Sequence, residues 1–233
     1  ADAKMSLFDA IRLTERLLGF AFTLQSIEHL KSFTNERYLF IPRLVLALLL
    51  IIGFHTTWVI FLLFLLSLAI LYRFQGPYNG GADRMGLLIL CCLCVVHLAP
   101  TQRWQELAVG YLAIQLVSSY FISGWVKVVN PDWRSGRALC DVFQFSVYPA
   151  SESLRAFSTS ARLLFCMSWA VMLVELLFPL SLITQTSLVA ALIVTACFHF
   201  ANACLFGLNR FFWIWLSAYP SILWFQFRFF GAG

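Results

Sequence analysis

Apolar runs that are long enough to form membrane-buried helices alternate with short polar loops along most of the chain. Residues 41–74 would be about 50 Å long as one helix, which exceeds a hydrocarbon core of about 30 Å, so we predict a hairpin that breaks at Gly53. The pattern predicts an all-α, polytopic membrane bundle of about seven to eight transmembrane helices. They are expected over residues 7–30, 41–53, 58–71, 87–98, 106–127, 162–183, 187–208 and 211–227.

The first and last of these segments carry features that a simple membrane helix lacks. Residues 7–30 include Arg12, Glu15 and Arg16 among apolar residues, so this helix either spans the membrane or lies partly in the interface. Pro220 is expected to interrupt the last helix, since proline removes a backbone donor and clashes with the preceding turn.

One long polar stretch, residues 128–161, separates the fifth predicted helix from the sixth. Its many aromatic residues predict a folded cap on the membrane surface rather than a free linker. The chain shows no internal repeat, and we predict a single transmembrane domain over residues 1–233.

The composition supports a multi-pass integral membrane protein. Of 233 residues, 61% are hydrophobic and 12% are charged, whereas soluble domains have about 25% charged residues. The net charge of +5 is spread over the loops. Scattered basic residues fit anionic lipid headgroups, while nucleic acid requires a concentrated basic face. We therefore expect membrane lipids as partners and no nucleic acid.

The cysteines and the N-terminus add little chemistry. No pair of cysteines has the spacing of zinc ligands, so we predict no metal site. Residues 1–5 lack the apolar stretch of a signal peptide, and none is expected. Six of the seven cysteines lie in apolar runs, and we predict that they pack as small buried hydrophobes: Cys91, Cys92, Cys94, Cys166, Cys197 and Cys204.

A polar stripe on the fifth predicted helix is the first candidate site. Gln115, Ser119, Ser123 and Lys127 recur every four residues, which places them on one face that would line a bundle interior. Desolvation favours the neutral amine of a lysine, and a neutral amine can act as a general base. The alternative is that Lys127 extends its amine to lipid headgroups at the helix end.

Other ionisable residues fall inside predicted helices, where they are costly and commonly functional. Glu175 either lines the site or is a buried carboxylate paired with an arginine or a neighbouring helix. His199 and Asn202 share one helix face, where they either line the site or hydrogen-bond between helices. His55 and His97 lie in a turn and near a helix end, and we predict that both are interfacial.

The run of residues 120–127, followed by Asp132-Trp133 and Gly136, resembles the lysine segment of vitamin K-dependent gamma-glutamyl carboxylase. That enzyme has bacterial relatives in the horizontally transferred transmembrane (HTTM) family. The resemblance implies that Lys127 is the base that deprotonates a vitamin K hydroquinone.

Two further segments resemble the same family. Residues 198–206 have the His, Asn and Leu-Phe spacing of a segment whose histidine lies by the quinone site. Glu175 before Pro179 resembles an acidic residue of the family, and residues 76–83 resemble its Asn/Gly-rich loop. We therefore predict Lys127 as catalytic and a quinone, quinol or other isoprenoid lipid as the cofactor. The predicted cofactor-binding residues are His199, Asn202, Glu175, Ser123 and Trp125.

The sequence departs from the carboxylase in ways that change the expected activity. Gly81 lies near the place of a functional histidine of the carboxylase, and one extra residue separates Lys127 from Trp133. The carboxylase also carries a large extramembrane domain that binds propeptides, whereas this chain stops just after its last predicted helix. We therefore do not expect carboxylation of propeptide-bearing clients.

Two hypotheses follow, and the sequence leaves open whether the protein is an enzyme. In the first, the protein is a vitamin K-dependent carboxylase-like enzyme or enzyme subunit that uses a quinol or lipid cofactor on a peptide or hydrophobic substrate. In the second, it is a non-catalytic structural subunit of a multi-chain membrane complex. Short bacterial relatives are associated with maturation of secreted peptide toxins, which implies partner chains and a bacterial inner membrane. A transporter or channel is less well supported, because the chain lacks inverted repeats and a filter sequence.

Overall fold

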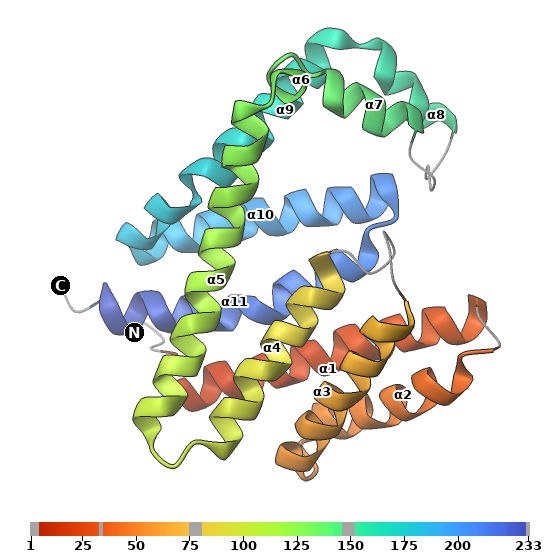
Figure 1. Ribbon diagram of the computed structural model, residues 1–233. Helices are drawn as coiled ribbons and strands as arrows, with labels where there is room; N and C mark the ends of the chain where they lie inside the picture. Colours follow the sequence, from red (N-terminus) through yellow and green to blue (C-terminus); the bar gives the residue numbers. More distant parts are fainter. Residues whose placement is uncertain (1–4, 33–34, 75–80, 146–151, 232–233) are drawn as a thin grey trace. The chain divides into compact units, whose positions relative to one another are not determined.

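The computed structural model describes residues 5–32, 35–74, 81–145 and 152–231, and within these ranges every element is a helix (Figure 1). The predicted all-α class is confirmed. Residues 75–80, which include positions 76–80 of the Asn/Gly-rich loop, and residues 146–151 of the predicted cap lie outside the described residues. The elements are α1 (Leu7–Ser32), α2 (Arg37–Ile52), α3 (Thr56–Arg73), α4 (Gly81–Leu98), α5 (Gln102–Val129), α6 (Pro131–Arg134), α7 (Arg137–Phe145), α8 (Glu152–Arg155), η2 (Ala156–Thr159), α9 (Ala161–Leu177), η3 (Phe178–Ile183), α10 (Gln185–Phe206) and α11 (Asn209–Phe229).

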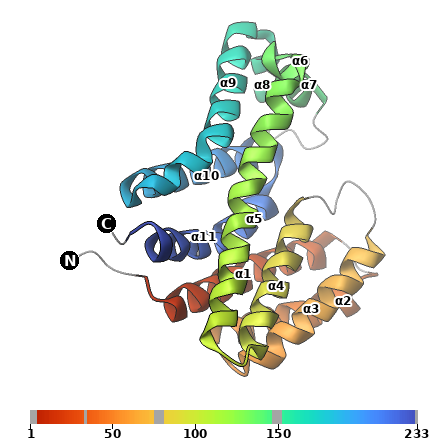
Figure 2. The ribbon, with the colours of Figure 1, turned by 60° about the vertical axis from the view of Figure 1, so that its left-hand side comes forward.

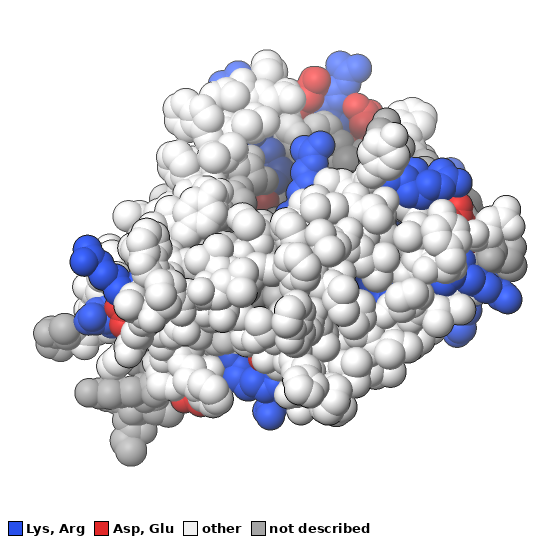
Figure 3. Space-filling model, turned by 60° about the horizontal axis from the view of Figure 1, so that its bottom comes forward, with Lys and Arg blue, Asp and Glu red and all other residues white. Residues whose placement is uncertain are grey.

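Five of the described segments are long and apolar enough to cross a membrane: α3, α4, α5, α9 together with η3, and α10. The sequence analysis predicts two or three further transmembrane helices, and these stay a prediction. Figure 3 shows one face of the molecule on which Lys and Arg lie in separate small groups and most of the surface carries no charge. Such a surface suits lipid contact and lacks a concentrated basic patch.

The chain divides into two compact units. The first comprises Ala1–Ile114 and Trp213–Phe229, and the second comprises Gln115–Phe212 and Phe230–Gly233. Helices α5 and α11 therefore each contribute to both units. The single domain over residues 1–233 stays a prediction.

In the first unit, α2 and α3 form the predicted hairpin and lie side by side (Figures 1 and 2). Gly53 takes a left-handed conformation with φ of 85°, and its N–H donates to the carbonyls of Leu49 and Leu50. Arg12 of α1 donates to the carbonyls of Leu50 at 3.0 Å and Ile51 at 2.8 Å. The last carbonyls of a helix are unsatisfied and carry partial negative charge, so a guanidinium is a favourable partner there.

The core of the first unit joins four helices. Its cluster of buried residues comes from α1, α4, α5 and α11, and consists of Ala10, Val96, Ala108, Val109 and Trp224. Small side chains from α1 and α5 leave room for the large indole. This packing holds the beginning of α1 beside the end of α4 and the beginning of α5, where a polar cavity is described below.

The predicted interruption at Pro220 is wrong, because α11 runs continuously through it. Proline removes one backbone donor from a helix, but serine hydroxyls and neighbouring helices can satisfy the groups around it in membrane proteins. Ser217 and Ser221 flank this turn, and their hydroxyls donate to the carbonyls of Ile214 at 2.7 Å and Ala218 at 2.6 Å. The helix therefore continues through Pro220 without the intrahelical bond from residue 220 to the Leu216 carbonyl.

In the second unit, the described part of residues 128–161 is folded, as predicted. It forms α6, α7, α8 and η2, which lie together at one end of α9 (Figure 2). Leu139 and Phe143, four residues apart on α7, are buried with Leu164 of α9. The opposite side of α7 exposes Asp141 and Gln144. This amphipathic packing makes the segment a cap on α9, and its place on the membrane surface stays a prediction.

The sixth predicted segment, residues 162–183, is two elements rather than one helix. The α-helix α9 ends at Leu177, and η3 continues as a 3₁₀-helix with Pro179 in its first turn. Because proline cannot donate to the preceding turn, the change of helix type follows from the sequence. As a result Glu175 lies in the last turn of α9 and not at the centre of a helix.

The predicted burial of the cysteines holds for Cys92 alone among the six, with Cys94 half-buried. The other four are exposed on the sides of apolar helices, the kind of surface that lipid covers, and they are Cys91, Cys166, Cys197 and Cys204. The residue type indicated low polarity, but it could not tell the bundle interior from the lipid face.

Candidate functional site

The second unit brings Lys127, Glu175 and Ser123 into direct contact. Lys127 Nζ donates to Glu175 Oε2 at 2.5 Å and to Ser123 Oγ at 2.8 Å, and Ser123 Oγ donates to Glu175 Oε1 at 3.2 Å. The side chains of Lys127 and Glu175 are only 17% and 5% exposed. The Lys127 amine therefore contacts protein groups, and the Glu175 carboxylate is paired with a cation of the preceding long helix, α5.

The residues that follow Lys127 turn the chain so that Trp133 lies near the lysine amine. Asn130 caps α6 by accepting from the Asp132 N–H at 2.9 Å, and Pro131 occupies the first turn, where a missing N–H costs nothing. The ring of Trp133 consequently lies with its centroid 5.3 Å from Lys127 Nζ. This distance is within the range of a cation–π interaction.

Two side chains of α9 fix α6 in this position. Ser168 Oγ donates to the Trp133 carbonyl at 2.5 Å, and Trp169 Nε1 donates to the Arg134 carbonyl at 3.1 Å. Because α9 also carries Glu175, the same helix positions both the carboxylate and the indole that face Lys127.

Tyr120, on the same helix as Lys127, contacts two further rings, the His199 imidazole and the Phe178 ring. Tyr120, two turns before Lys127, has its hydroxyl 2.8 Å from His199 Nε2 of α10, and both side chains are buried. The Tyr120 and Phe178 rings are 4.3 Å apart between centroids. Phe178 lies three residues after Glu175, so Lys127, Glu175 and His199 are joined through adjacent side chains of one unit.

Not every residue of the predicted site joins this arrangement. Asn202 is half-buried one turn after His199 on α10. Trp125 is 55% exposed. Residues two apart on a helix do not share a face, so the geometry of α5 separates Trp125 from Lys127 and Ser123.

Only part of the predicted polar stripe of α5 belongs to the cluster around Lys127. Ser123 and Lys127 belong to the cluster, but Ser119 Oγ donates to the Leu116 carbonyl of its own helix at 2.7 Å. The residues that sequence reasoning missed are Tyr120, Phe178 and Trp133. Tyr120 could have been found by its spacing of seven from Lys127, since seven residues make almost two helical turns.

Comparison with known proteins identifies the family. The HTTM domain model matches residues 94–227, more than half of the chain. The chain belongs to the HTTM family. No curated protein and no solved structure shows a significant match. The matched range of this HTTM protein contains Lys127, Glu175, His199 and Tyr120, whereas α1, α2 and α3 precede it.

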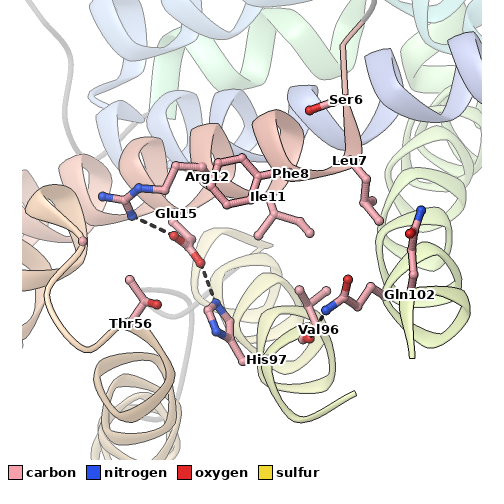
Figure 4. A pocket seen from close by; sticks show the side chains of 12 residues that line it. Ser6, Leu7, Phe8, Ile11, Arg12, Glu15, Thr56, Val96, His97 and Gln102 are labelled. Carbon is pink, nitrogen blue, oxygen red and sulfur yellow. Dashed lines mark hydrogen bonds and ion pairs between the residues drawn. The ribbon is translucent and has the colours of Figure 1, made fainter. Parts of the chain in front are cut away.

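The HTTM protein has a second polar cluster, in its first unit. Glu15 of α1 is 3% exposed and accepts from Arg12 Nη1 at 2.7 Å. His97 Nε2 of α4 lies 2.6 Å from the other Glu15 oxygen, and its Nδ1 lies 3.1 Å from Thr57 Oγ1 of α3. Figure 4 shows Glu15 between Arg12 and His97.

This second cluster shows which protein group His97 contacts. The residue is near a helix end, as predicted, and its side chain contacts Glu15, while its place at the membrane interface stays a prediction. The available signal was Glu15 among the apolar residues of the first predicted helix, since a buried carboxylate needs a partner. Across the described residues, no group of three His, Cys, Asp or Glu side chains is arranged to hold a metal ion.

Proposed function

We propose that this HTTM protein is a membrane enzyme or enzyme subunit that uses a quinol or related isoprenoid cofactor, with Lys127 and Glu175 as its proton-accepting pair. The proposal rests on the contact of 2.5 Å between Lys127 Nζ and Glu175 Oε2 in a largely buried part of the second unit. It is supported by the resemblance of residues 120–136 to the lysine segment of the vitamin K-dependent carboxylase. The substrate would be a peptide or a hydrophobic molecule in a bacterial inner membrane.

An ammonium group is not a base, so the pair has to act as a unit. Lys127 becomes able to accept a proton when its own proton moves to Glu175, which leaves a neutral amine beside a neutral acid. A buried site of low dielectric constant penalises separated charges and therefore keeps this neutral arrangement accessible. The proton of a bound hydroxyl would then pass to Lys127 Nζ while Glu175 retains the first proton. Protonation in such a coupled site belongs to the pair and not to one residue.

The other residues of the cluster suit the head of a quinol. A quinol offers a hydroxyl whose deprotonation begins its oxidation. Lys127 Nζ donates two of its three hydrogens within the cluster, so one is left for a quinol oxygen. Tyr120, Phe178 and His199 provide aromatic rings in the same unit. Aromatic rings bind flat apolar groups through stacking. Ser123 would also hold Glu175 in place, because its hydroxyl contacts both members of the pair.

The second candidate is a non-catalytic subunit of a membrane complex. The observation that favours it is that Lys127 already contacts Ser123, Glu175 and the Trp133 ring. In that case the pair only ties α5 to α9, and partner chains would supply the chemistry.

The two candidates differ in whether the protein binds a quinone through this cluster. The test titrates menaquinone-4 into the full chain in phosphatidylcholine nanodiscs and follows quenching of tryptophan fluorescence. We expect saturable binding that Lys127→Ala and His199→Ala each weaken about tenfold or more. Lys31→Ala, which changes an exposed lysine at the end of α1, should bind as the wild type does.

A folding defect is separated from a binding defect by a double variant. Lys127→Met with Glu175→Leu removes both charges and leaves apolar side chains of similar size, a change that buried ion pairs often tolerate. Its thermal unfolding should resemble that of the wild type, while menaquinone-4 binding is lost. Unchanged binding in Lys127→Ala and His199→Ala together would refute the cofactor site and leave the subunit role.

A further inference from the structure

A cavity of about 670 Å³ lies within the first unit, beside the second polar cluster. Its volume is that of a small-molecule site. It opens between the beginning of α1, the α2–α3 turn, the end of α4 and the beginning of α5 (Figure 4). The residues used below are Leu7, Phe8, Ile11, Glu15, Gln102 and Gln105.

The charged groups of the cavity wall balance each other. Arg12 donates to Glu15 and also to the carbonyls of Leu50 and Ile51, so its guanidinium is committed to the protein. An anionic head would meet the buried Glu15 carboxylate without a free cation beside it, and a cationic head would meet the Arg12 guanidinium. Burying an unbalanced charge is costly, which favours an uncharged ligand.

The remaining hydrogen-bonding capacity includes several acceptors, besides the second hydrogen of each glutamine amide. Gln102 donates its amide to Glu106 at 3.1 Å, and Gln105 donates its amide to the Val96 carbonyl at 3.2 Å. Within the described ranges, both side-chain carbonyl oxygens accept no bond. A carboxylate has about four acceptor positions, and Arg12 and His97 use two of those of Glu15. A ligand that supplies O–H donors fits this wall.

Another part of the cavity wall, on the same helix as Glu15, is apolar and reaches the surface. Leu7, Phe8 and Ile11 line it from the first two turns of α1, and Phe8 is 74% exposed. In a membrane protein this exposed edge gives an alkyl chain a continuous apolar path from the cavity to lipid. One ligand can therefore place a polar head against the amides and a tail along α1.

From these features we propose that the cavity binds a single uncharged amphiphile with a hydroxyl-bearing head of the glycerol type and an alkyl tail. The head donates to Glu15, Gln102 and Gln105, and the tail lies along Leu7, Phe8 and Ile11. The site shares no residue with the Lys127 cluster.

The test uses 1-oleoylglycerol as the probe and native mass spectrometry of the full chain released from lauryldimethylamine oxide micelles, a detergent without hydroxyl groups. We expect one bound molecule at saturation. Methyl oleate, which has the tail without the hydroxyls, and glycerol, which has the head without the tail, should not compete for it. Equal binding of either compound would overturn the proposal.

Variants assign the bound molecule to the cavity. Gln105→Leu removes one acceptor and should weaken binding about five- to tenfold, the effect of one hydrogen bond. Ile11→Trp fills the cavity and should abolish binding while the thermal unfolding midpoint stays at or above that of the wild type. Gln144→Leu, an exposed residue of α7, is the matched control and should bind normally. Retained binding in Ile11→Trp would overturn the proposal even if Gln105→Leu did not fold.

Discussion

Gly124 of α5 lies so close to Leu176 of α9 that a Cβ on Gly124 would be 2.6 Å from the Leu176 backbone nitrogen. Real Cβ atoms do not approach backbone so closely, and the neighbouring backbone atom cannot rotate away. Small residues at helix contacts let membrane helices approach through their backbones. This contact places Lys127, one turn after Gly124, within reach of Glu175, the residue before Leu176.

The first prediction concerns this contact. Gly124→Ala should separate α5 from α9 and destabilise the protein by about 1–3 kcal/mol, the usual cost of overpacking. The measurement is the free energy of unfolding in mixed micelles. Gly110→Ala is the control on the same helix, since its Cβ would meet Phe225 at an ordinary 3.7 Å. That control should be neutral or slightly stabilising because alanine favours helix, and equal losses in both variants would contradict the contact.

The second prediction tests whether Lys127 and Glu175 are energetically coupled. Lys127→Met and Glu175→Leu should each cost about 3–5 kcal/mol, because each leaves a buried charge without its partner. The double variant should cost clearly less than the sum of the two. A double-mutant cycle on unfolding free energies measures the difference.

An exposed pair provides the comparison for that cycle. Arg228 and Glu106 are 3.8 Å apart, with side chains 55% and 24% exposed. Exposed pairs contribute about 0–1 kcal/mol, so Arg228→Met and Glu106→Leu should be nearly additive. Additivity at Lys127 and Glu175 as well would show that their contact does not stabilise the fold.

The sequence predicts elements well where local chemistry decides them. Gly53 allows a left-handed turn, and a helix of 34 residues would exceed the membrane, so the α2–α3 hairpin follows from local rules. The fold class was predictable for the same kind of reason, whereas the family was predicted from the resemblance of the segment around Lys127. Pro220 shows the limit of local rules, because α11 continues through a residue that usually ends a helix.

The partners within each site could not be predicted, since they depend on which helices are in contact and on how far each is shifted along its axis relative to the other. Lys127 and Glu175 are 48 residues apart, and Glu15 and His97 are 82 apart. Sequence spacing within one helix identifies a shared face, as for Ser123 and Lys127, but it does not identify the helix opposite. The contact at Gly124 sets that register, and only the three-dimensional structure contains it.

The third prediction concerns the link between Tyr120 and His199. Tyr120→Phe removes the hydroxyl that contacts His199 Nε2 and keeps the ring against Phe178. Hydrogen bonds between membrane helices average about 0.6 kcal/mol, with a maximum of about 1.7, so the loss of unfolding free energy should fall in this range. Tyr120→Ala also loses the ring and should cost about 3–5 kcal/mol. Tyr111→Phe, at an exposed position of α5, should have no effect on the unfolding free energy. A similar loss in Tyr111→Phe would show that the loss in Tyr120→Phe does not come from the contact with His199.

The fourth prediction is that Trp133 shields Lys127. Trp133→Leu should remove the ring that lies 5.3 Å from Lys127 Nζ, while the backbone carbonyl still accepts from Ser168. We expect a loss of stability of about 0.5–2 kcal/mol, the range of cation–π interactions. The amine should also become more accessible, so acetic anhydride should acetylate Lys127 several times faster, as measured by peptide mass spectrometry. Trp125→Leu is the matched control near the same end of α5, because Trp125 is exposed on a different face. Trp125→Leu should leave both the acetylation rate and menaquinone-4 binding unchanged. Faster acetylation in Trp125→Leu but not in Trp133→Leu would show that Trp125, and not Trp133, covers Lys127.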